Sequence, residues 1–104
     1  MMKRSDFYGW VGADLGEVAA GISARLGLEL HTRWSDHRGG YYWSTVLGAH
    51  PSIYVMRNAE DEEGQLHEED HPEMTVLLDS ADLTDEQCAL LEEMGGRLLH
   101  RAVF

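Results

Sequence analysis

The chain has 104 residues, of which 43% are hydrophobic, and its formal net charge is −11 at pH 7. Length and composition predict one globular domain, and the acidic balance excludes a surface suited to nucleic acid or to an anionic membrane. The single cysteine excludes an internal disulfide framework, so we expect a protein of the reducing cytoplasm.

The first third of the chain predicts a strand, a helix and a second strand. Residues 7–13 are apolar and aromatic, as in a strand. Asp14 and Glu17 have the spacing of a helix start, and apolar residues then recur every three or four positions as far as Gly27. Residues 28–34 alternate between apolar and polar side chains, which predicts a strand with one buried face.

Three more strands are predicted in the middle of the chain. Residues 41–47 and 53–57 are rich in aromatic and β-branched side chains. They lie in an uncharged stretch that Gly48 and Pro51 divide, so we expect a pair of strands there and no membrane span. Beyond a run of acidic residues, the short apolar segment 75–78 suits a central strand that is covered on both faces.

A second helix and a last strand complete the predicted order. Thr84 and Gln87 have the spacing of a capping box, which marks the start of a helix. Gly95 is placed to cap the end of that helix, and residues 97–104 then predict a strand. The whole order is strand, helix, three strands, acidic loop, strand, helix and strand.

This order predicts an α+β fold in which two helices pack on one mainly antiparallel sheet of five to six strands. Such an arrangement is the simplest way to bury the apolar stripes of both helices. We expect a single domain over residues 1–104, with an acidic loop at about 58–73.

The acidic loop is the most unusual feature of the sequence. Of the nineteen acidic residues, eight fall between positions 60 and 73, where no Lys or Arg occurs. The other ninety residues carry eight basic and eleven acidic side chains and therefore sum to only −3. A lobe of such charge attracts a basic protein surface or a cation. The side chains expected to contact a partner are Glu60, Asp61, Glu62, Glu63, Glu68, Glu69 and Asp70.

The segment His67–His71 matches the H-E-x-x-H pattern of zinc peptidases. That chemistry requires a helix, because only a helix brings both imidazoles to one zinc ion. Pro72 follows directly and disfavours helical angles at His71. A calcium loop centred on Gly64 fails as well, because its first ligand would be Ala59. We therefore interpret the match as incidental and expect no metal and no other cofactor.

Nothing in the sequence forms a recognisable catalytic group, so we expect no enzyme and no catalytic residues. Cys88 lies in the first turn of the second predicted helix, which favours a reactive thiol, but Asp85 and Glu86 oppose that effect. We expect Cys88 to be a small buried side chain packed on Leu83.

Aromatic residues are concentrated in the central pair of strands. Alternation places Tyr42 and Trp43 on opposite faces of the sheet, so one of them can lie on the face that the helices leave open. Ordinary core packing accounts for such residues in strands. The alternative is that Tyr42 and Trp43 anchor a bound protein, since Tyr and Trp contribute strongly at interfaces.

Several elements together resemble those of small acidic immunity proteins from bacterial polymorphic and contact-dependent toxin systems. They are the helix start at Asp14 and Glu17, the pair Tyr41-Tyr42 on a central hairpin, Arg57-Asn58 before an acidic loop, the hydrophobic strand Met74–Leu78, and a final helix and strand. The resemblance implies a small α/β protein that binds a toxin domain and blocks its active site. It transfers no functional residue by position.

The expected function is therefore that of a noncatalytic inhibitor that neutralises a basic protein, such as a toxin domain, through the acidic loop and the adjacent aromatic residues. Many toxin domains act on nucleic acid through basic clefts, which a dense group of carboxylates can occupy. The alternative is a small-molecule sensor or accessory domain with a pocket between helix and sheet, because fold alone leaves function open.

Overall fold

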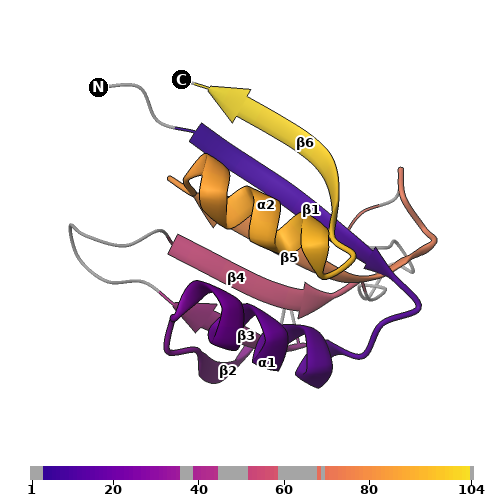
Figure 1. Ribbon diagram of the computed structural model, residues 1–104. Helices are drawn as coiled ribbons and strands as arrows, with labels where there is room; N and C mark the ends of the chain where they lie inside the picture. Colours follow the sequence, from indigo (N-terminus) through magenta and orange to yellow (C-terminus); the bar gives the residue numbers. More distant parts are fainter. Residues whose placement is uncertain (1–3, 36–38, 45–51, 59–67, 69, 104) are drawn as a thin grey trace.

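The computed structural model describes residues 4–35, 39–44, 52–58, 68 and 70–103, and for residues 33–35, 39–44 and 52 it describes the backbone alone (Figure 1). The predicted order of elements is confirmed. The elements are β1 (Arg4–Val11), α1 (Leu15–Leu26), β2 (His31–Ser35), β3 (Gly39–Ser44), β4 (Ser52–Arg57), β5 (Met74–Ala81), α2 (Asp85–Glu93) and β6 (Arg97–Val103).

The six strands of the described residues form one sheet in the order β2-β3-β4-β5-β1-β6, and every neighbouring pair is antiparallel. Both helices lie on the same face of this sheet (Figure 1). The predicted α+β fold, with two helices on one antiparallel sheet, is therefore confirmed. Among the described residues, neither helix has the length and apolarity needed to cross a membrane.

The main core lies between the helices and the sheet. Val18 and Ile22 from α1 and Leu91 from α2 pack there against alternate residues of the central strands, such as Tyr8 and Leu78. A smaller apolar cluster on the sheet consists of Met56, Met74 and Leu77, with Phe7, Tyr54 and Leu99 packed against it. Strand β5 contributes to both clusters, in agreement with its predicted central position.

The helix ends follow the predicted local chemistry. The Asp14 side chain accepts from the Glu17 backbone N–H, and Gly27 closes α1 in the left-handed conformation. At α2 both hydrogen bonds of the capping box between Thr84 and Gln87 are present. Gly95, with φ of +94°, then ends this helix. These interactions involve neighbours in sequence, which is why the sequence reveals them.

Several predicted strand boundaries are wrong. Strand β1 ends at Val11 and not at residue 13, β3 starts at Gly39 and not at residue 41, and β5 spans Met74–Ala81 and not 75–78 alone. Strand β1 begins at Arg4, three residues before the predicted start. Arg4 and Asp6 pair with β6 in the sheet, and they also belong to a buried group of ion pairs described below. Strand β2 begins at His31 and not at residue 28, because Leu28 turns into the core directly after α1. The last residues predicted for β3, 45–47, lie outside the described residues.

The turns that lead into the two helices share one backbone feature. Gly12 before α1 has φ of +64°, and Asp82 before α2 has φ of +63°. Each residue lies two positions before its helix cap, Asp14 or Thr84. A left-handed conformation costs a residue with a Cβ about 1 kcal/mol relative to glycine.

We therefore expect Gly12→Ala and Asp82→Gly to change stability in opposite directions. A Cβ at Gly12 meets no atom within 4 Å, so Gly12→Ala tests backbone strain alone and should lower the free energy of unfolding by about 1 kcal/mol. Asp82→Gly should raise it by about 0.5 kcal/mol. Urea unfolding measures both, and a destabilised Asp82→Gly variant would contradict the interpretation.

Candidate functional site

Asn58, the residue after β4, holds the C-terminal part of the acidic stretch, residues 60–73, against the sheet. Its Nδ2 donates to the carbonyl oxygens of Glu68, His71 and Met74 at 3.3, 3.2 and 3.0 Å. Its Oδ1 accepts from the Glu68 backbone N–H at 2.8 Å, and its own backbone N–H donates to the Thr75 oxygen at 3.1 Å. Asn58, just before the acidic stretch, and Glu68, within it, are therefore fixed beside each other.

Two of the seven predicted acidic contacts lie within the described residues. Glu68 is half-buried, and its carboxylate accepts from the Asp70 backbone N–H at 3.2 Å. Asp70 is exposed. In the part of the chain that the structure describes, neither carboxylate forms an ion pair with an arginine or a histidine. The other predicted contacts lie outside the described residues: Glu60, Asp61, Glu62, Glu63 and Glu69.

Glu73, the last carboxylate of the stretch, is paired within the molecule. Its Oε1 lies 2.6 Å from a guanidinium nitrogen of Arg97 and 3.6 Å from Nδ1 of His71. The pKa of Glu73 is held below its ordinary value, first by a backbone hydrogen bond at Glu73 itself and next by the Arg97 side chain. This carboxylate is thus already compensated, unlike Glu68 and Asp70.

The zinc-peptidase pattern at 67–71 lacks helical structure over its described part. Glu68 lies in a bend, Asp70 in a turn, and His71 in neither a helix nor a strand, while His67 lies outside the described residues. Over the described ranges, no group of three or more His, Cys, Asp or Glu side chains is placed to hold a metal ion.

The predicted aromatic contacts Tyr42 and Trp43 lie on β3, which occupies the second position from one edge of the sheet. In the register of the sheet, Tyr42 is opposite Val55 and Trp43 is opposite Tyr54. Tyr42 and Trp43 are therefore neighbours on a strand that lies far from β6. In the sheet, β4, β5 and β1 separate β3 from β6.

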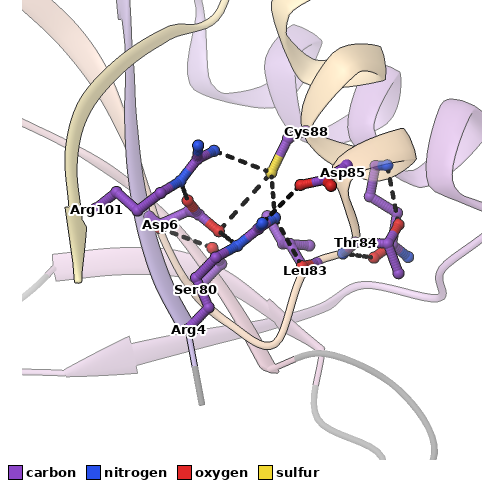
Figure 2. Close-up of polar contacts among 9 residues, drawn as sticks. Arg4, Asp6, Ser80, Leu83, Thr84, Asp85, Cys88 and Arg101 are labelled. Carbon is purple, nitrogen blue, oxygen red and sulfur yellow. Dashed lines mark hydrogen bonds and ion pairs between the residues drawn. The ribbon is translucent and has the colours of Figure 1, made fainter. Parts of the chain in front are cut away.

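A second group of polar and charged side chains surrounds Asp6, which is fully buried on β1. Its Oδ2 accepts from Nε of Arg4 at 2.9 Å, and its Oδ1 accepts from Nε of Arg101 on β6. Arg4 also donates to Asp85 at 2.6 Å and to the Leu83 carbonyl at 2.9 Å. Figure 2 shows both guanidinium groups directed toward Cys88. We call Arg4, Asp6, Cys88 and Arg101 the Asp6 cluster.

Charge compensation explains the protonation behaviour around the Asp6 cluster. The pKa of Arg4 is raised, first through its hydrogen bond to Asp85 and then through Asp6, although desolvation acts against this shift. The pKa of Arg101 is raised mainly by its hydrogen bond to Asp6. The pKa of Asp85 is correspondingly lowered by the Arg4 hydrogen bond. Both guanidinium groups therefore remain charged, and one buried carboxylate faces two cations.

Sequence reasoning missed this cluster, although one signal for it was present. Arg4, Asp6, Tyr8 and Trp10 alternate along β1, and Tyr8 and Trp10 are core residues. A charged residue in the same phase as buried aromatics indicates a compensated buried charge. A strand that starts at residue 7, as predicted, leaves out Arg4 and Asp6 and therefore hides that they alternate in step with Tyr8 and Trp10. The expectation that Cys88 is buried with Leu83 in the core is confirmed.

Comparison with known proteins adds no relative to this picture. A scan against protein-family models gives no match to the chain, and a search of curated proteins gives no similar sequence. The arguments for function therefore rest on the site geometry.

Replacing Asn58 with Ala should release the backbone of Glu68, His71 and Met74 from the end of β4 while leaving the sheet folded. We expect the free energy of unfolding to fall by about 2 kcal/mol, because several partly shielded hydrogen bonds are lost. Hydrogen exchange at the Glu68 amide, which donates to Asn58, should accelerate more than exchange in β6, the internal control. Equal acceleration at both places would show that Asn58 does not hold this part of the chain.

Replacing Asp6 with Asn should destabilise the protein because two guanidinium groups lose their buried carboxylate. We expect the free energy of unfolding to fall by about 2 kcal/mol. This is less than the usual cost of breaking a buried ion pair, because both arginines reach solvent. The matched control is Asp85→Asn, which also removes a partner of Arg4, but from a side chain that is 90% exposed. Thermal and urea unfolding should show little change for this control, and equal losses in both variants would contradict the assignment.

Proposed function

We propose that this protein is a noncatalytic inhibitor of the immunity type, which neutralises a basic protein such as a bacterial toxin domain in the cytoplasm. The observation that carries the proposal is the Asn58 clamp, meaning the hydrogen bonds between the Asn58 side chain and the backbone of Glu68, His71 and Met74. The clamp holds Glu68 and Asp70 in place while their charges remain uncompensated among the described ion pairs. A prearranged charge lowers the ordering cost of binding.

Further negative charge lies at the same end of the fold. Helix α2 ends there, and Arg97, which follows it, pairs with Glu73 of the acidic stretch (Figure 1). Glu92 and Glu93 in the last turn of α2 are exposed, and that turn contains no basic residue. Carboxylates at a helix C-terminus oppose the helix dipole, so these two residues do not serve helix stability. Attraction of a cationic partner accounts for their position.

In this proposal Glu60, Asp61, Glu62, Glu63 and Glu69 extend the charge carried by Glu68 and Asp70, and Tyr42 and Trp43 supply packed contacts. Long-range attraction between such a lobe and a basic cleft accelerates association and makes it dependent on salt. Inhibition then requires no chemistry by this chain. The partner needs only a cationic surface at its active site.

The first test identifies the partner. Affinity capture with the tagged protein from its own cells, at low and moderate salt, should yield a basic protein in stoichiometric amounts. Adding the purified protein should abolish the activity of that partner without turnover. Capture of only acidic or neutral proteins at both salt concentrations would refute the proposal.

The second test locates the contact. Replacing Glu60, Asp61, Glu62 and Glu63 with Gln or Asn should slow association at low salt by roughly tenfold, because the steering charge is removed. The control set removes the same amount of charge from exposed positions elsewhere: Glu17, Glu29, Asp82 and Glu86. This set should change the rate much less. Equal slowing by both sets would assign the effect to net charge, and unchanged rates would exclude the acidic stretch.

A further inference from the structure

Cys88 is a buried thiol surrounded by groups that stabilise negative charge. The side chain is 3% exposed and lies in the first turn of α2. A nitrogen of Arg4 lies 3.2 Å from Sγ, and one of Arg101 lies 3.7 Å from it. The thiol itself donates to Oδ2 of Asp6 at 3.7 Å. A small core residue requires no such contacts, whereas a reacting sulfur benefits from two cations and a nearby proton acceptor.

The Tyr8 hydroxyl supplies an independent indication at the same place. Tyr8 is fully buried, and its hydroxyl oxygen has no hydrogen-bond partner of ordinary geometry among the residues that the structure describes. The pKa of this phenol is raised, first by burial and next by its contact with the Cys88 side chain. Tyr8 and Cys88 belong to the same core cluster, so this unused donor lies in the part of the interior that also contains the sulfur. A buried donor without an acceptor is unfavourable, so an oxygen atom attached to Sγ would satisfy a group that the reduced protein leaves unsatisfied.

Among the described side chains that contact this sulfur, the two arginines of the cluster reach solvent. The Arg4 side chain is 23% exposed and that of Arg101 is 38% exposed, whereas Asp6 is fully buried. Long arginine side chains change rotamer readily at a surface, so a molecule little larger than water can reach the sulfur by displacing their ends. A bulky thiol reagent or a protein thiol requires a larger opening.

We propose that Cys88 is an oxidation site at which hydrogen peroxide converts the thiol to a sulfenic acid held by Arg4, Arg101 and Tyr8. The sulfur attacks one peroxide oxygen, so the S–O bond forms as the O–O bond breaks. The thiol proton passes to Asp6 and then to the departing hydroxide, which leaves as water. Sulfur is oxidised and peroxide is reduced, and no other reactant is needed.

The proposal predicts that folding accelerates oxidation, the reverse of what burial alone does. Full-length protein is treated with hydrogen peroxide for a timed interval and the peroxide is removed with catalase. The chain is then unfolded in urea that contains dimedone, so that the buried sulfenic acid becomes accessible, and the adduct is quantified by intact mass. Cys88 is the only cysteine, so the adduct reports this site, and Cys88→Ser gives the background. The native chain should react about tenfold faster than the chain in urea, because only the folded chain places two guanidinium groups and a proton acceptor beside the sulfur.

Variants then separate the cluster from burial. Arg101→Gln should slow oxidation severalfold, while the matched control Arg97→Gln, on the same strand but paired with Glu73, should leave the rate unchanged. Arg101→Lys should retain most of the rate, and circular dichroism confirms folding of each variant. Tyr8→Phe should shorten the lifetime of the sulfenic acid without slowing its formation.

Two results would overturn the proposal. One is a native rate equal to or below the rate in urea, which would make Cys88 an inert core residue. The other is equal behaviour of Arg101→Gln and Arg97→Gln, which would show that the cluster does not activate the thiol. Neither result bears on the inhibitor proposal, because that proposal depends on neither Cys88 nor any other residue of the Asp6 cluster.

Discussion

The buried carboxylate of Asp6 is the interaction on which the arrangement of β1, β6 and α2 depends. Arg4 is supplied by β1 and Arg101 by β6, and Asp6 and Arg101 are direct partners in the antiparallel register. A slip of one residue would move Arg101 to the other face of the sheet and leave Asp6 without this cation. The ion pairs therefore select one register for the edge strand, whatever their net contribution to stability.

The same pairing determines the charge that the molecule presents. The chain has eight basic residues, and the described structure places three of them, Arg4, Arg97 and Arg101, in ion pairs with its own carboxylates. Because these cations are compensated internally, they do little to offset the acidic stretch at a distance. Among the described residues of the acidic stretch, Glu68 and Asp70 thus retain carboxylates without an ion-pair partner.

Local chemistry accounts for what the sequence predicts well, and distance along the chain accounts for the rest. The caps at Asp14 and Thr84 are formed by residues three positions apart, and the α+β order follows from periodicity. Arg101, by contrast, lies 95 residues from Asp6, and the Asn58 side chain bonds as far as 16 residues ahead. No pattern of spacing identifies which arginine compensates a buried carboxylate or which carbonyls an asparagine side chain reaches.

The Asn58 clamp and the Asp6 cluster lie at opposite ends of β5, since Met74 accepts from Asn58 and Ser80 donates to the Asp6 carbonyl oxygen. The strand between them is central and its residues 76–78 are buried, and such segments open only with the whole fold. Changes of charge in the acidic stretch should therefore leave the thiol environment intact, and oxidation of Cys88 should leave the clamp intact. A coupling between the two sites would require global unfolding, which a loss of sheet protection in hydrogen exchange would reveal.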